Sequence, residues 1–353
     1  MRDKMWAWNL YAPADLRYEE VPVPEIGPGE ALVKVRAVGV CGSDISRLMK
    51  TGTYHYPTIC GHEFAGEVVA AAPDVANCRV GDRVTVIPLL PCGTCDYCRL
   101  GHYQLCEHYN YLGSRTDGAY AEYVKVWAAN VLPLPKGVPF EAAAMTDPAA
   151  VALHAVRRLP LQPGQSVVVL GIGPIGLLAL EWAKLLGAGK VVAVDIFPEK
   201  LAVAKDLGAD YVINGREEDP VKKVQELLGG ADHAIEFAGN KITQDQALRL
   251  LAKRGHAVFG GISHTDLPLS PEAVEHLLRY ELTLHGSWNS SFASLSENDW
   301  RVALEFMGTG QLKTAPIITH RLPLPELKDA FQMMSERRAY FGKVMFFPHG
   351  EEK

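Results

Sequence analysis

The sequence predicts an α/β protein of two domains, one of which is built on a doubly wound parallel sheet. Its 353 residues exceed the size at which single hydrophobic cores stop growing, about 250 to 300 residues. From about residue 150 to 288, β-type runs such as "SVVVL", "KVVAVD" and "HAIEFAG" alternate with helical segments, which indicates a parallel sheet. Residues 1–149 instead hold short β-type runs punctuated by Gly and Pro, typical of a β-rich domain.

Composition narrows the class of partner. A net charge of -6 and a pI near 6.1 leave no basic footprint for nucleic acid or anionic lipid, so a small molecule is the expected partner. The N-terminal segment "MRDKMWAWNL" lacks the apolar core of a secretory signal, and a cytoplasmic protein is expected. The uncharged run 165–180 is broken by three glycines and a proline and is too short to span a membrane.

Four of the seven cysteines lie within the stretch "LPCGTCDYCRLGHYQLCE" at about 90–107. Their spacing is C-x2-C-x2-C-x7-C, which lets four thiolates converge on one tetrahedral ion. A reducing compartment disfavours disulfides, so a structural zinc site is favoured over a redox or iron–sulfur use of the same thiols. The ligands would be Cys92, Cys95, Cys98 and Cys106.

A second group of possible ligands lies upstream. Cys41 stands in "VGVCGSDISRL", and His62 and Glu63 follow about twenty residues later in "ICGHEFAGEVV". A thiolate and an imidazole are two of the ligands that a catalytic zinc uses. Cys41 alone would more often be a buried core cysteine, but its combination with Gly-His-Glu and with "VGDRVTV" at 80–86 favours a metal site.

The third signal is a glycine-rich turn between a strand and a helix. A β-branched run at 166–170 leads into G-x-G-x-x-G, and the second strand ends at Asp195, 19 residues after the last glycine. This arrangement predicts a Rossmann domain that binds a dinucleotide pyrophosphate at the helix N-terminus. The candidate cofactor-binding residues of the turn are Gly171, Gly173, Pro174, Ile175 and Gly176.

Taken together, these motifs are similar to those of the zinc-dependent medium-chain alcohol and polyol dehydrogenases over essentially the full length. The residues that carry the resemblance are "CGSD", "GHEFAGEV", the four-cysteine lobe, "GIGPIG" and "GKVMFF". Within that family, "ELTLHGSWNSSF" and "NDW" resemble the galactitol-1-phosphate 5-dehydrogenases. The resemblance implies a discontinuous GroES-like catalytic domain at 1–149 and 289–353, a Rossmann domain at 150–288, two zinc ions per chain and a homodimer or homotetramer formed through the edges of the Rossmann sheets.

The resemblance also implies roles at the catalytic zinc. Cys41 and His62 would hold the ion, which would lower the pKa of a substrate hydroxyl. Ser43 matches the family's proton-relay hydroxyl, although it could be a turn-forming serine. The relay histidine of the alcohol branch is replaced by Ser46, with His55 a weak substitute.

Three acidic residues complete the expected site. Asp44 matches the carboxylate that orients the histidine ligand. Glu63 would bind zinc directly or exchange with water. Asp147 stands in "MTDPAAV", where relatives have Glu-Pro, and is a further candidate ligand; the alternative is that it caps a helix.

Cofactor choice follows from charge. Asp195 would accept hydrogen bonds from the ribose hydroxyls and repel a 2′-phosphate, and the two residues after it supply no arginine, so NAD is favoured over NADP. Lys200 is a candidate for the adenosine ribose or a solvated helix residue. Lys343 matches a family cation near the nicotinamide phosphate, with a surface lysine as the alternative.

The expected reaction is oxidation of a secondary hydroxyl of a polyol or polyol phosphate, with galactitol 1-phosphate to tagatose 6-phosphate as the best candidate. Sorbitol, L-threonine and butanediol dehydrogenases share the framework and are alternatives; a zinc-free reductase and a non-enzymatic relative are less favoured, because ligands and glycine motif are intact. Ser287 and Asn289 are candidate substrate contacts or part of a polar surface loop. Cations available for a phosphate are Arg47, Lys50, Arg115 and Arg279.

Overall fold

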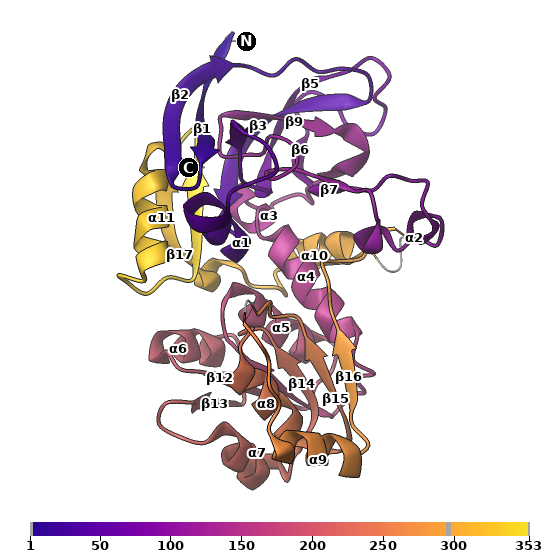
Figure 1. The fold of residues 1–353 in the computed structure, drawn as a ribbon. Coiled ribbons are helices and arrows are strands. Elements are labelled where there is room, and N and C mark those ends of the chain that lie inside the picture. Colours follow the sequence, from indigo (N-terminus) through magenta and orange to yellow (C-terminus); the bar gives the residue numbers. More distant parts are fainter. Residues whose placement is uncertain (1–2, 264, 294–297, 352–353) are drawn as a thin grey trace. The chain divides into compact units, whose positions relative to one another are not determined.

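The computed structural model describes residues 3–263, 265–293 and 298–351, and its contacts divide the chain into two compact units (Figure 1). The first unit comprises Met1–Asp147, Ser291–Thr309 and Ile318–Lys353, and the second comprises Pro148–Ser290 and Gly310–Ile317. The boundaries lie within two residues of 149 and 288, but the short segment 310–317 joins the second unit. One reason is that the Lys313 amide donates to the buried Glu181 carboxylate at 2.9 Å.

The second unit is built on a six-stranded sheet in which every neighbouring pair is parallel. All six strands overlap β-type runs of the sequence. In spatial order they are β13 (Tyr211–Asn214), β12 (Lys190–Asp195), β11 (Ser166–Leu170), β14 (Ala231–Glu236), β15 (Leu251–Phe259) and β16 (Thr283–Gly286). The predicted doubly wound α/β fold is therefore confirmed.

Helices follow most of these strands and cover the sheet. The central strand β11 is buried at every position, as expected for a strand that has helices on both faces. The helices are α5 (Pro174–Leu185), α6 (Pro198–Asp206), α7 (Pro220–Leu228), α8 (Lys241–Arg249) and α9 (Pro271–Arg279). Four of the five begin with proline, a residue that suits the first helical turn because its missing N–H would have no intrahelical partner there. The unit continues from α4 (Thr146–Arg157).

The first unit is β-rich. Its main sheet has the order β10-β6-β5-β3-β18-β17, with β9 also paired to β3. The strands are β10 (Val131–Pro133), β6 (Arg83–Val86), β5 (Glu63–Ala71), β3 (Glu30–Gly39), β18 (Lys343–Phe347), β17 (Ile318–Pro323) and β9 (Tyr123–Trp127). A three-stranded sheet joins β2 (Asp15–Pro22), β1 (Lys4–Ala12) and β4 (Thr58–Ile59), and a two-stranded one joins β7 (Leu89–Leu90) and β8 (Asn110–Tyr111).

Strands from both ends of the chain form the core of this unit. The C-terminal β18 pairs with β3, and α11 (Leu327–Glu336) contributes Leu327, Phe331 and Met334 to the same apolar cluster as β1, β3 and β5. The return of the chain explains why this domain is discontinuous. Among the helices that the structure describes, none is long and apolar enough to cross a bilayer.

Candidate functional site

Strand register brings the upstream cysteine, histidine and glutamate together. In the antiparallel pair of β3 and β5, Gly39 lies opposite Glu63. The chain continues from β3 to Cys41, which precedes the short helix α1 (Gly42–Ser46), and His62 directly precedes β5. The ligand atoms of Cys41, His62 and Glu63 all lie within 4.8 Å of one another. One thiol, one imidazole and one carboxylate at this separation fit a single borderline metal ion such as zinc.

Gly61 shows how tightly the histidine is placed. Its φ is +92°, a left-handed conformation that favours glycine. A Cβ at this position would also lie 2.8 Å from the ring of Tyr120. The residue before His62 must therefore be glycine for both conformational and steric reasons.

The imidazole of His62 lies between two carboxylates. Its Nδ1 is 3.5 Å from Asp44 Oδ1, and its Nε2 is 3.8 Å from Asp147 Oδ2. His62 is buried, and Nδ1 has no hydrogen-bond partner among the described residues. Burial alone would lower the pKa of His62, but the nearby Asp44 and Cys41 charges raise it. With Nδ1 facing Asp44, Nε2 is the nitrogen available to a metal, so Asp44 is placed where it could orient the imidazole.

Asp44 is itself held by two further side chains. It is fully buried, and it accepts from Arg47 at 2.6 Å and from the Tyr120 hydroxyl at 3.0 Å. Burial would raise its pKa, but His62, Arg47 and Tyr120 lower it overall, so the carboxyl stays ionised. Arg47, one of the cations available for a phosphate, is thus engaged by Asp44.

Lys343 lies beside Glu63, one of the candidate metal ligands. Its Nζ forms an ion pair with the Glu63 carboxylate and donates to the Val40 carbonyl at 2.9 Å, and both charged side chains are 3% exposed. Lys343 is therefore not a surface lysine. In the antiparallel pair of β18 and β3, Met345 lies opposite Gly39, and this register places Lys343 beside Cys41.

Asp147 faces the same centre from the first turn of α4. It is 6% exposed, and its Oδ1 has no hydrogen-bond partner in the part of the chain that the structure describes. Burial raises its pKa to about 7, with Glu63 adding to the increase while His62 and Lys343 oppose it. A buried carboxylate with Oδ2 close to His62 Nε2 and Oδ1 without a partner among the described residues fits a metal ligand better than a helix cap, whose oxygen would accept from backbone amides.

Ser43 lies next to the cysteine ligand. Its hydroxyl donates to Cys41 Sγ at 3.2 Å and the side chain is exposed. The hydroxyl is therefore both adjacent to the metal centre and in contact with water.

The sequence did not reveal Tyr111. Its ring packs edge-on against His62 with centroids 5.5 Å apart. Its pKa is raised, first by burial and then by the negative charges of Asp147 and Cys41, so the hydroxyl stays protonated. No motif marks this tyrosine, because it reaches the centre only through the pairing of β7 and β8.

The four-cysteine lobe is a second group of residues that could hold a metal ion. The four Sγ atoms lie within 4.8 Å of one another, with Cys92 and Cys98 separated by 3.9 Å and Cys95 and Cys106 by 4.0 Å. A tetrahedral zinc with bonds of about 2.3 Å places its sulfur atoms about 3.8 Å apart. These distances match that tetrahedron and are far too long for a disulfide.

Hydrogen bonds favour thiolates at Cys92 and Cys95, whereas burial and the neighbouring thiols raise the pKa of Cys98 to about 12. The backbone amides of Cys95 and Cys92 point at Cys92 Sγ (3.4 Å) and Cys106 Sγ (3.2 Å), respectively. The Thr94 side chain and amide, together with other amides, lower the pKa of Cys92 to about 5. A thiolate is the form that binds zinc, so the chemistry of this donor set also fits the ion.

The glycine-rich turn occupies its expected place between β11 and α5. Gly171 has a φ of +90°, and a Cβ there would lie 2.5 Å from the Ala238 amide nitrogen; at Gly176 a Cβ would lie 2.1 Å from the Gly171 carbonyl. Gly173 precedes Pro174, the first residue of α5, and Ile175 follows it. The turn borders a cavity of about 960 Å³ that is also lined by Asp195, Lys200, Asn240 and Thr243.

Asp195 holds this turn as well as facing the cavity. Its carboxylate accepts from the amides of Ile172 (2.7 Å) and Ile196 (2.7 Å), and Lys200 Nζ lies 3.6 Å away. Arg216, which sequence reasoning missed, packs over the Phe197 ring at 5.2 Å. Two cations thus flank the end of β12.

The candidate substrate residues Ser287 and Asn289 follow β16 in the second unit. The Ser287 amide donates to the Phe259 carbonyl at 3.0 Å, and Asn289 Oδ1 accepts from the Ser290 amide at 2.8 Å. Asn289 has a φ of +54°. Its side-chain oxygen is therefore used within its own turn.

Two protein-family models match the chain, and two relatives are similar to it over nearly its whole span. Residues 27–136 match the alcohol dehydrogenase GroES-like domain, and residues 174–309 match the zinc-binding dehydrogenase domain. The chain is 34% identical to sorbitol dehydrogenase of Bacillus subtilis, with 98% of each chain covered. It is 36% identical to galactitol 1-phosphate 5-dehydrogenase of Escherichia coli, covering 94% of this chain and 97% of the relative.

Solved structures show the same architecture. The crystal structure of galactitol-1-phosphate dehydrogenase from E. coli has a TM-score of 0.91 and 35% identity, covering 98% of this chain and 100% of that one. A putative zinc-binding dehydrogenase from Sinorhizobium meliloti bound to NADP has the same TM-score and coverage at 31% identity.

Proposed function

Since the chain belongs to the zinc-binding medium-chain family of alcohol and polyol dehydrogenases, we propose that it oxidises a secondary hydroxyl of a polyol or polyol phosphate to a ketone with NAD. The observation that carries this proposal is the ligand set of the catalytic centre. Cys41 supplies one thiol, and the remaining candidates are His62, Glu63 and Asp147. Carboxylates are harder ligands than thiolates and leave the ion better suited to neighbouring hydroxyl oxygens, which a polyol offers and an alkanol does not.

The chain's own residues hold the reacting groups. When bound, zinc supplies a Lewis acid that lowers the pKa of the substrate hydroxyl, and the nicotinamide accepts the hydride. Asp44, held by Arg47 and Tyr120, keeps His62 oriented. The exposed Ser43 hydroxyl, 3.2 Å from Cys41 Sγ, can pass the released proton to water.

We further propose two zinc ions per chain, one at Cys41, His62, Glu63 and Asp147 and one in the four-cysteine lobe. For the cofactor, NAD is favoured by the Asp195 carboxylate, which would accept from ribose hydroxyls and repel a 2′-phosphate. Lys200 and Arg216 favour NADP instead, because they place positive charge near the end of β12, where a 2′-phosphate would lie.

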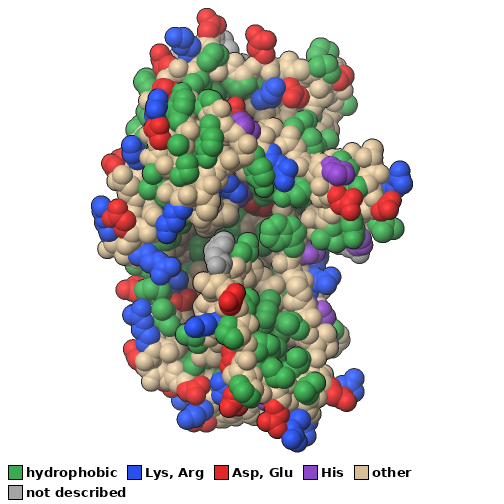
Figure 2. Space-filling view, viewed as in Figure 1, with side chains coloured by type: hydrophobic (Ala, Val, Ile, Leu, Met, Phe, Trp, Pro, Cys, Tyr) green, Lys and Arg blue, Asp and Glu red, His purple; other side chains and the backbone are tan. Residues whose placement is uncertain are grey.

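A homo-oligomer formed through β16 is supported by the second unit's surface. β16 is an edge strand, and exposed apolar side chains lie on it, after it and on α9: Leu284, Trp288, Val274 and Leu278. Figure 2 shows hydrophobic side chains gathered on this side of the unit. Exposed apolar patches of this kind mark interaction sites, and an unpaired edge strand can pair with its copy.

Galactitol 1-phosphate, with tagatose 6-phosphate as product, is the substrate we place first, followed by sorbitol, L-threonine and 2,3-butanediol. The test is to measure kcat/KM with NAD for these four compounds and for ethanol and 1-butanol. We expect a polyol or its phosphate to exceed the alkanols by orders of magnitude, because an alkanol leaves the polar groups of the site unpaired. Faster oxidation of the alkanols would contradict the proposal and make the protein an alcohol dehydrogenase.

A further inference from the structure

Arg115 packs against two aromatic rings in the first unit. Its Cζ lies 4.4 Å from the ring centroid of Tyr54 and 4.6 Å from that of Tyr109. Stacking against aromatic rings holds a guanidinium in place by cation–π attraction while its N–H donors, which point outward in the guanidinium plane, stay available. Arg115 is therefore oriented by its neighbours without using its hydrogen bonds.

The main chain under Arg115 is also fixed. The amides of Arg115 and Thr116 both donate to the Tyr111 carbonyl, at 3.0 and 3.2 Å. The Thr53 hydroxyl donates to the Ser114 carbonyl at 2.6 Å, which ties this turn to the segment that carries Tyr54. The side chain thus projects from a closed turn rather than from a free loop.

Arg115 differs from the two other arginines considered for a phosphate, because both of those are bound by carboxylates. Arg47 is bound by Asp44 at 2.6 Å, and Arg279 by Glu275 at 2.6 Å on an exposed helix face. Within residues 3–263, 265–293 and 298–351, no carboxylate forms an ion pair or hydrogen bond with Arg115. A half-buried guanidinium without an acid in the protein is suited to an anion supplied by a ligand.

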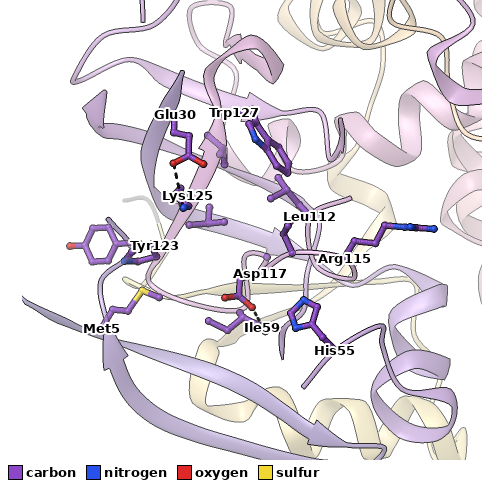
Figure 3. A pocket seen from close by; sticks show the side chains of 15 residues that line it. Met5, Glu30, His55, Ile59, Leu112, Arg115, Asp117, Tyr123, Lys125 and Trp127 are labelled. Atoms are coloured by element: carbon purple, nitrogen blue, oxygen red, sulfur yellow. Dashed lines mark hydrogen bonds and ion pairs between the residues drawn. The ribbon is translucent and has the colours of Figure 1, made fainter. Parts of the chain in front are cut away.

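The stem of Arg115 lines a cavity of about 340 Å³, but its guanidinium points away from that cavity (Figure 3). The charged groups that do face the cavity have partners: Lys125 lies 3.3 Å from Glu30, and Asp117 accepts from the Ile59 amide at 2.9 Å. The cavity is therefore not where an anion bound by Arg115 would lie.

A chain of aromatic contacts connects Arg115 with the metal centre. Tyr109 contacts Arg115 and also lies edge-on to Tyr111, with ring centroids 6.3 Å apart. Tyr111 in turn lies 5.5 Å from the His62 ring. The rings of Tyr109 and Tyr111 thus lie between the guanidinium and the histidine ligand in an unbroken series of contacts.

We propose that Arg115 binds the terminal phosphate of an acyclic polyol phosphate whose secondary hydroxyl lies at the Cys41–His62 centre. This inference rests on the proposed function and narrows its substrate class to phosphate monoesters. The planar guanidinium matches two phosphate oxygens at once. Tyr54 and Tyr109 are positioning residues for it, because they contact the guanidinium and not the phosphate.

The test compares galactitol 1-phosphate with galactitol as substrates of the zinc-loaded protein. For Arg115→Gln we expect KM for galactitol 1-phosphate to rise about 10- to 100-fold, because the substitution removes a charge-assisted hydrogen-bonded contact. We expect kcat/KM for galactitol to change by less than about twofold. Calorimetric titration of galactitol 1-phosphate without NAD should show the same loss of affinity. Added salt should weaken phosphate binding in the wild type and not in the variant.

Arg17→Gln is the matched control. Arg17 also stacks on a tyrosine, with Cζ 4.2 Å from the Tyr11 ring, but its guanidinium is bound by Asp15, so this variant should behave like the wild type. If Arg115→Gln proves unstable, Tyr54→Leu is the second variant, because Tyr54 is 67% exposed and its loss should not disturb the fold. Tyr54→Leu should raise KM for galactitol 1-phosphate, whereas Tyr54→Phe, which keeps the ring, should have the KM of the wild type.

Equal losses for galactitol and its phosphate would make Arg115 a packing residue and overturn the inference. The inference would also be overturned if oxidation of galactonate, which carries a carboxylate, depended on Arg115 as strongly as oxidation of galactitol 1-phosphate does. A wild-type enzyme that oxidises galactitol but gains nothing from the phosphate overturns the inference and leaves the proposed function intact. If the wild type oxidises neither compound, the proposed function is contradicted. If calorimetry also detects no binding of galactitol 1-phosphate, both the proposed function and this inference are overturned.

Discussion

Lys343 and Glu63, 280 positions apart in the sequence, form a buried ion pair beside Cys41. Both side chains are 3% exposed, so neither charge is screened by water. Lys343 therefore fixes the carboxylate that is the third candidate ligand of the catalytic centre. This pair also explains why a lysine near the C-terminus belongs to the catalytic unit.

Lys343→Met should destabilise the protein by about 3–5 kcal/mol, since removing one partner leaves the other charge buried and uncompensated. The free energy of unfolding can be measured with urea, with zinc content held constant. Adding Glu63→Gln should recover part of the loss, because the unpaired charge disappears. Lys205→Met, at an exposed helix position, is the control. Additive effects of the two substitutions would show that the pair is not energetically coupled.

Cys41→Ser and Cys95→Ser should separate the two metal centres. Cys41→Ser should abolish turnover with little change in melting temperature, because the catalytic ion does not hold the core together. Cys95→Ser should lower the melting temperature, because the lobe has few apolar residues of its own and depends on its metal. Metal analysis should show about one zinc lost per chain in each variant. Equal falls in melting temperature would argue against separate roles.

Asp195→Asn should weaken NAD about tenfold and shift preference toward NADP. The substitution removes the charge that repels a 2′-phosphate, while Lys200 and Arg216 remain nearby. Binding constants for both cofactors can be measured by fluorescence titration, with the exposed Asp206→Asn as control. An NAD constant within about twofold of the wild type, or ~0.4 kcal/mol, would mean that Asp195 does not contact the ribose.

Glu181 should make stability depend on pH. Burial raises its pKa to about 7 from the ordinary value of 4.5, and the Lys313 amide offsets this increase only in part. Oε2 has no hydrogen-bond partner among the described residues. The folded state therefore favours the protonated acid, so the stabilising effect is complete below about pH 4.5 and is lost as pH rises through 7. Glu181→Gln should remove this loss, worth roughly 2–3 kcal/mol. Parallel pH profiles of unfolding free energy in the two proteins would contradict this assignment.

Leu284→Glu should disrupt pairing of the edge strand β16. The new charge would be buried between two copies of an apolar surface, at a cost of several kcal/mol per ion. Light scattering after size-exclusion chromatography should show the wild type as a dimer or tetramer and the variant with a smaller mass. Leu100→Glu, at another exposed leucine, should leave the mass unchanged. A monomeric wild type would refute the proposed assembly.

The fold and the two metal-binding motifs could be predicted from the sequence because their information is local. The six parallel strands appear as separate β-type runs, the lobe cysteines all lie within 15 positions, and the glycines of the turn are fixed by backbone constraints at Gly171 and Gly176. Short-range spacing of this kind needs no knowledge of distant partners. Cys41 and His62 can likewise be identified as candidate ligands from their local sequence motifs, without knowledge of their geometry.

Tertiary structure decided which distant groups surround those motifs. Strand register alone brings Lys343 to Glu63, and the β7–β8 pairing brings Tyr111 to His62. The sequence offered four cations for a phosphate, and only their surroundings distinguish Arg47, already bound by Asp44, from Arg115, held between tyrosines. The sequence determines which side chains are charged, but whether a charge has an oppositely charged partner depends on neighbours that folding brings from elsewhere in the chain.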